Sequence, residues 1–99
     1  MGHFERGVEN YKKGNHLIAI NEFTKWLERA PNDVKAYIYR GNAYSSIGNH
    51  HAALINFSQA IQIDPRNISA HNNRAVTHEK LNNYEEAIKD YSKTIEIAP

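Results

Sequence analysis

The chain has 99 residues, which suits one domain rather than two, and it contains no cysteine, which excludes disulfide frameworks, cysteine zinc sites and thiol catalysis. Lysine and arginine number 12 against 11 aspartates and glutamates, so no strong net charge attracts nucleic acid or an anionic membrane. No apolar run approaches the roughly 20 residues of a membrane-spanning helix, and we expect a soluble, cytoplasmic protein.

Several residue types recur at a fixed interval of 34 residues. The three prolines of the chain, Pro31, Pro65 and Pro99, all belong to one such series. A fixed period of this size indicates one structural unit stacked several times. We place the units at residues 1–33, 34–67 and 68–99 of a single domain that covers residues 1–99. The other series are Gly7 and Gly41; Gly14 and Gly48; Arg6, Arg40 and Arg74; Asn15, Asn49 and Asn83; Ala19, Ala53 and Ala87; and Phe23, Phe57 and Tyr91.

Each unit contains two stretches in which apolar residues fall at helical spacing, separated by a turn. Gly48 suits the left-handed position that ends a helix, and asparagine at position 82 tolerates the same conformation in the third unit. The dipeptide Asp64-Pro65 ends the helix before it. No stretch shows the alternation of a strand, which predicts an all-α fold. The expected helices cover residues 3–13, 16–29, 34–47, 50–63, 68–81 and 84–97.

These residues resemble the tetratricopeptide repeat, in which a large residue, Leu, Gly and Tyr on a first helix precede Ala, Phe, Ala and Pro on a second. The arginine series stands where that family has leucine, and His71 stands at the first aromatic position. The resemblance spans essentially the whole chain. It implies an α-solenoid of three helix-turn-helix repeats, a right-handed superhelix whose first helices line a concave groove. The second unit carries the pattern in Tyr37, Gly41, Tyr44, Ala53, Phe57, Ala60 and Pro65.

The resemblance also implies a function, which is to bind a peptide or a partner helix in the groove as a scaffold or adaptor. Asn42 and Asn73 are the leading candidates, because an amide offers a donor and an acceptor to an extended backbone of any sequence. Tyr39 adds the amphipathic contact area of an interface anchor. By analogy with the family, the groove residues are Phe4, Val8, Tyr11, Lys35, Ile38, Tyr39, Asn42, Asn72, Asn73 and Val76.

One subclass of similar proteins clamps the C-terminal carboxylate of chaperone tails with two lysines, one arginine and two asparagines. The matching positions here are Phe4, Val8, Tyr39, Ser69 and Asn73. Only Asn73 offers an amide and none is cationic. We therefore expect a groove suited to a neutral or mixed peptide rather than a carboxylate clamp.

No arrangement of residues in the sequence points to catalysis or to a cofactor. His50 and His51 are neighbours on a helix and point in different directions, so they do not chelate a metal well. The carboxylates of Glu85 and Glu86 lack a nucleophile or base partner. We expect no enzyme activity, no metal and no cofactor, and a protein or peptide partner rather than nucleic acid or membrane.

A second hypothesis is self-association. The sequence stops at Pro99 with no polar capping helix after the third unit, although the ends of solenoids normally need one. Ile88, Ile95 and Ile97 are then expected to be partly uncovered and to favour stacking with another copy as a homo-oligomer. A fragment of a longer repeat array would show the same pattern.

Overall fold

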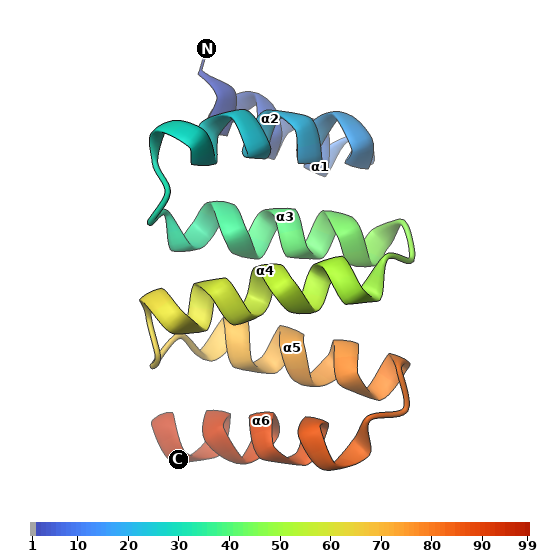
Figure 1. Cartoon of the computed structure of the whole chain (residues 1–99), viewed down its shortest axis with the longest axis vertical. Helices are drawn as coiled ribbons and strands as arrows, with labels where there is room; N and C mark the ends of the chain where they lie inside the picture. Colours follow the sequence, from blue (N-terminus) through green and yellow to red (C-terminus); the bar gives the residue numbers. More distant parts are fainter. Residues whose placement is uncertain (1) are drawn as a thin grey trace.

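The computed structural model describes residues 2–99, which form six α-helices and no strand (Figure 1). Met1, the first residue of the expected domain, lies outside the described residues. The two chain ends lie at opposite ends of the stack. The all-α fold predicted from the sequence, and the solenoid of helix pairs that the family resemblance implies, are confirmed. Its helices are α1 (His3–Lys12), α2 (His16–Arg29), α3 (Val34–Ser46), α4 (His50–Ile63), α5 (Ile68–Lys80) and α6 (Tyr84–Ile97).

The turns inside the three helix pairs use left-handed backbone. Gly14 and Gly48 both have φ of 82°, and Asn82 has φ of 61° at the equivalent turn. The conformation predicted for Gly48 and Asn82 is therefore confirmed. Helices α1, α3 and α5 each end one residue earlier than expected, because the residue that follows each helix already acts as its C-cap and leads into the turn.

In each of the first two helix pairs, a phenylalanine of the second helix packs against a glycine of the first. Phe23 and Phe57 are fully buried. A Cβ atom added to Gly41 would lie 2.6 Å from Cε1 of Phe57, and one added to Gly7 would lie 2.7 Å from Cε1 of Phe23. The missing side chain therefore lets the two helices of a pair approach until the ring fills the space between them.

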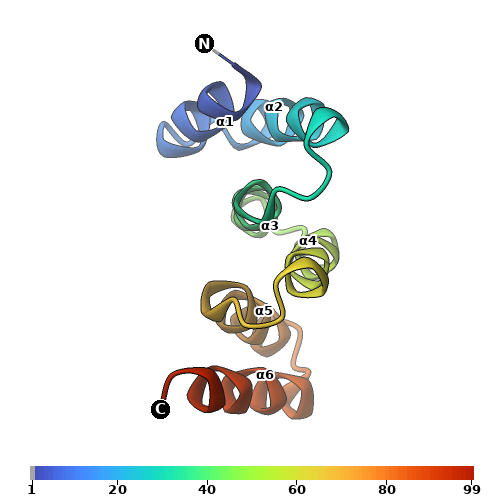
Figure 2. The same ribbon diagram turned by 90° about the vertical axis from the view of Figure 1, so that its left-hand side faces the viewer.

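The first helices of successive pairs lie closer together than the second helices. Helix α1 contacts α3 and α3 contacts α5, whereas within residues 2–99 no two of α2, α4 and α6 contact each other. Figure 2 shows α1, α3 and α5 along one side of the stack, with α2 and α4 along the other. The stack therefore curves so that α1, α3 and α5 line its inner side.

Three arginines spaced by the repeat period bind acceptors on the second helices, and we call these pairs the arginine ladder. Each arginine uses Nε to donate to a residue 16 positions later in the same pair, over 2.7–3.0 Å. Arg40 and Arg74 also donate from Nη1 to Thr24 and Ser58 of the preceding pair. Arg40 and Arg74 therefore each connect three helices, whereas Arg6 connects α1 to α2. The ladder pairs are Arg6 with Glu22, Arg40 with Asn56, and Arg74 with Asp90.

The first rung of the ladder should make stability depend on pH. The pKa of Glu22 lies below its usual value, chiefly because of its hydrogen bond with His3, with Arg6 adding to the effect and burial opposing it. A carboxyl with a lowered folded-state pKa stabilises the fold above its ordinary pKa of about 4.3 and loses that contribution as the pH falls further. We therefore expect the stability gap between the wild type and Glu22→Gln to shrink on acidification.

Chemical denaturation at a series of pH values from neutral to strongly acidic measures this gap. Glu28→Gln is the matched control, because Glu28 is exposed on the same helix and forms no ion pair within residues 2–99. Its effect should stay below about 0.5 kcal/mol. A gap for Glu22→Gln that is constant over the whole range would contradict the assigned role of the carboxylate.

Candidate functional site

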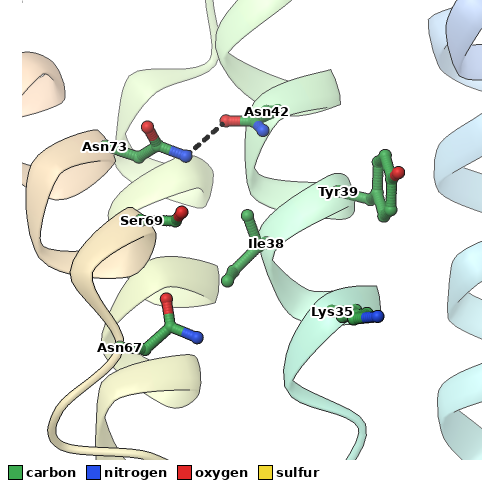
Figure 3. Close-up of a pocket in the computed structure, with 7 residues that line it drawn as sticks. All are labelled: Lys35, Ile38, Tyr39, Asn42, Asn67, Ser69 and Asn73. Atoms are coloured by element: carbon green, nitrogen blue, oxygen red, sulfur yellow. Dashed lines mark hydrogen bonds between the residues drawn. The ribbon is translucent and has the colours of Figure 1, made fainter.

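A hollow of about 440 Å³ lies between α3 and α5 on the inner side of the stack. Figure 3 shows residues of α3 on one wall and residues of α5 and its N-cap on the other. The hollow brings together five of the residues predicted for the groove. Its lining consists of Lys35, Ile38, Tyr39, Asn42, Asn67, Ser69 and Asn73.

A hydrogen bond joins the two asparagines that sequence reasoning ranked highest. Nδ2 of Asn73 donates to Oδ1 of Asn42 over 3.2 Å (Figure 3). No hydrogen bond between described residues uses Nδ2 of Asn42 or Oδ1 of Asn73. The pair therefore keeps the NH2 group of Asn42 as a donor and Oδ1 of Asn73 as an acceptor, which are the two kinds of group needed to pair with one peptide unit of an extended chain.

The other residues around the hollow differ in how far their polar groups are already used. Asn67 caps α5 by accepting a hydrogen bond from the backbone nitrogen of Ala70 at 2.9 Å, so its side-chain oxygen has a partner. Ser69 and Lys35 are exposed, and neither side chain has a hydrogen-bond or ion-pair partner within residues 2–99. Ile38 supplies the apolar part of the lining on α3.

Tyr39 packs against the core as well as lining the hollow. Its ring stacks on Phe23 with a centroid distance of 5.5 Å and an interplanar angle of 11°. The rings of Phe4 and Tyr11 meet it edge-on at 6.1 and 5.6 Å. These three predicted groove residues therefore form one aromatic cluster on the core, so replacing Tyr39 would disturb packing as well as any binding.

The remaining predicted residues lie apart from the hollow between α3 and α5. Phe4 and Val8 line a second, more open hollow on α1 together with Glu5, Glu9 and Lys12. Asn72 and Val76 are exposed on α5 and line neither hollow.

The sequence pattern identified the arginine series but not the residues on the second helices that the arginines bind. Glu22, Asn56 and Asp90 recur with the same 34-residue period, and that recurrence was the signal that could have revealed them.

His71, which stands where the family has an aromatic residue, makes the same contact as Tyr37 at the equivalent position of the second unit. Tyr37 donates its hydroxyl to the Pro31 carbonyl at 2.9 Å, and Nε2 of His71 lies 2.9 Å from the carbonyl of Pro65.

Residues 2–99 contain no group of three or more histidine, aspartate or glutamate side chains placed to hold a metal ion. In the same part of the chain, no helix combines the length and the apolar character needed to cross a bilayer.

Stacked helical hairpins with a hollow along their first helices define the class of repeat proteins that act as scaffolds for protein interactions. Three tetratricopeptide repeat models match overlapping segments of the sequence, at residues 22–55, 41–82 and 68–99. The chain belongs to the tetratricopeptide repeat family, with about three repeats, as the sequence pattern predicted.

The solved structures similar to this chain include several tetratricopeptide repeat domains. The first such domain of Spaghetti (RPAP3), bound to the HSP90 peptide SRMEEVD, is 26% identical with a TM-score of 0.94, and the match covers 98% of this chain and 77% of that one. The tetratricopeptide repeat domain of Arabidopsis OM64 is 25% identical with a TM-score of 0.94, and the match covers 98% of this chain and 80% of that one. The first domain of human RPAP3 is 26% identical with a TM-score of 0.92, covering 98% and 76%. No curated protein matches the sequence.

Proposed function

We propose that this chain is a non-enzymatic adaptor of the cytoplasm that binds a peptide segment in the hollow between α3 and α5. The observation that carries the proposal is the Asn42–Asn73 pair, which keeps the NH2 group of Asn42 and the side-chain oxygen of Asn73 without a partner among the described residues, beside Ile38. An extended peptide would pair its backbone with the two amides and place an apolar side chain on the isoleucine. The Spaghetti domain, with its bound HSP90 peptide, is a structural precedent for a peptide on this fold.

The proposed ligand is a neutral or mixed peptide segment and not a terminal carboxylate. At the positions of the carboxylate clamp, α1 carries the apolar side chains of Phe4 and Val8. The hollow around them also contains Glu5 and Glu9, with Lys12 as its only cation. A terminal carboxylate in this place would find one lysine beside two carboxylates, and not the cluster of cations that a carboxylate clamp supplies.

Binding measurements on asparagine variants test the proposal. A peptide is first selected on the full chain from a phage-displayed random library, and its affinity is measured by fluorescence anisotropy. Asn42→Ala and Asn73→Ala should each weaken binding by about tenfold, because a hydrogen bond to the peptide backbone is lost. The double variant should be little weaker than either single variant, because the two amides act as one unit.

Asn21→Ala is the matched control, since it removes an exposed amide from α2 on the outer side. Thermal denaturation of each variant separates binding from folding. The loss of one neutral hydrogen bond should lower stability by at most about 1 kcal/mol. A fall in affinity that follows the fall in stability across all variants would assign Asn42 a structural role and contradict the proposal.

A second candidate function is association through the exposed side of α6 at the end of the stack, which carries Ile88 and Ile95. We call this side the outer face of α6, and the self-association hypothesis depends on the same residues. Ile88 and Ile95 on this helix are 63% and 66% exposed. Ile97, near the end of the same helix, is half-buried. Large apolar side chains exposed on one helix face are typical of an interaction surface.

A further inference from the structure

The outer face of α6 carries the same pattern of residues as two surfaces inside the stack. These are the surface of α2 that contacts α3 and the surface of α4 that contacts α5. Thr24 on α2 and Ser58 on α4 are 34 residues apart, and they accept hydrogen bonds from Nη1 of Arg40 (3.2 Å) and of Arg74 (3.1 Å). The next position of this series is Ser92 on α6. Its side chain is exposed and has no hydrogen-bond partner among the described residues. Helix α6 therefore offers the hydroxyl of the series without an arginine to bind it.

Apolar residues on the same face continue the pattern. One series runs through Ile20 and Leu54 to Ile88, and the other through Leu27 and Ile61 to Ile95. On α2 and α4, which α3 and α5 cover, these side chains are buried or half-buried, whereas on α6 they are mostly exposed. The outer face of α6 therefore has the same kinds of apolar residue as the surfaces of α2 and α4 that contact the next helix.

The first helix of another copy is a poor occupant for this face. Ala43 and Thr77 are 0% and 2% exposed on the helices that pack in this way. At the equivalent position, α1 carries Glu9, which is exposed and paired with Lys13 at 3.1 Å. Glu5 is also exposed one turn earlier on α1. Stacking α1 onto α6 would remove these carboxylates from water, which is unfavourable without new partners.

We infer that the outer face of α6 binds the first helix of a helical hairpin in a partner protein, and that this helix carries an arginine between two small residues. In α3 and α5 an alanine precedes the arginine by four residues, and an alanine or threonine follows it by three. All four small residues are buried, so they allow the helix backbone to approach the face below. The two examples in this chain are Ala36, Arg40 and Ala43, and Ala70, Arg74 and Thr77.

The inference rests on the second candidate function, association through α6, and is independent of the hollow between α3 and α5. Its test uses the full chain and a fluorescein-labelled peptide that copies residues 32–65, the segment that contains α3 and α4. We expect saturable binding by fluorescence anisotropy, weakened about tenfold by Ile88→Glu and several-fold by Ser92→Ala or by Arg40→Leu in the peptide. Ile55→Glu is the matched control, because Ile55 is 70% exposed on α4 and should not contribute.

Joining the same segment directly after Pro99 gives a second measurement that does not require the peptide to fold alone. Because Pro99 is equivalent to Pro31, the joined copy keeps the 34-residue period and places its arginine 16 positions after Ser92, the separation seen for Arg40 and Thr24. We expect the melting temperature to rise by several degrees, and we expect Ile88→Glu to remove that rise.

The possible outcomes distinguish a failure of the inference from a failure of the second candidate function, association through α6. No peptide binding and no thermal gain would show that the α6 face does not associate, which overturns both. Binding that is indifferent to Ser92→Ala and to the peptide substitution Arg40→Leu would overturn the requirement for arginine. Dimers of the chain alone in sedimentation velocity, lost in Ile88→Glu, would identify a second copy as the occupant and overturn the inference while supporting association.

Discussion

Phe57→Ala is expected to lower the free energy of unfolding by about 3–5 kcal/mol, which is the cost of emptying a fully buried phenylalanine site. Phe57 is 1% exposed and its ring lies directly against the backbone of Gly41. The backbones of α3 and α4 resist collapse into the space, because each also packs against a neighbouring pair. Urea denaturation followed by circular dichroism measures the change. A loss below about 1 kcal/mol would contradict this description of the core.

Gly41→Ala provides the control for this interpretation. Alanine normally stabilises a helix relative to glycine by about 1 kcal/mol. Here its Cβ would lie within 2.6–2.9 Å of three ring atoms of Phe57, so we expect a net loss of about 1–3 kcal/mol. In the Phe57→Ala background the clash is gone, and the same change should become neutral or favourable. Additive effects of the two substitutions would show that the residues do not constrain each other.

Arg74→Met is expected to cost about 3 kcal/mol, because it leaves a buried carboxylate without its main partner. Asp90 is 6% exposed and accepts hydrogen bonds from Nε and Nη2 of Arg74 at 2.9 and 2.8 Å. The nearest other basic groups are Nδ1 of His71 at 3.6 Å and Nε2 of His78 at 4.0 Å, both too far for a good hydrogen bond. Equilibrium denaturation at neutral pH measures the loss.

Arg40→Met tests whether charge is the cause. Its partner, Asn56, is buried but neutral, and keeps a hydrogen bond from Nδ2 to the Ala52 carbonyl at 2.8 Å. We expect a smaller loss, of about 1–2 kcal/mol. Adding Asp90→Asn to Arg74→Met should recover part of the stability. Equal losses for the two arginine variants, with no recovery, would contradict an electrostatic role for Asp90.

The local structure of this chain could be predicted from its sequence because each signal depends on near neighbours. Helical spacing located all six helices to within a residue of their ends. Glycine and asparagine located the left-handed turns at Gly48 and Asn82. The repeat period extended each local signal to the other units.

The contacts between helices could not be predicted in the same way. The Asn42–Asn73 bond joins residues 31 positions apart, so the 34-residue period does not reveal it, and it depends on how α3 and α5 are offset. Ile38 and Tyr39 are neighbours, and only the rotation of α3 about its axis decides how much of the Tyr39 ring reaches the core. The arginine ladder likewise depends on the angle at which the helices cross.

The most direct test of the proposed binding site is a nuclear magnetic resonance titration of the isotope-labelled chain with the selected peptide. Side-chain amide signals are resolved individually, so Asn42 and Asn73 report on the hollow itself. We expect these two amides and the backbone amide of Ser69 to shift most, with little change on α2. Shifts confined to the outer helices, with both asparagine signals unmoved, would contradict binding between α3 and α5.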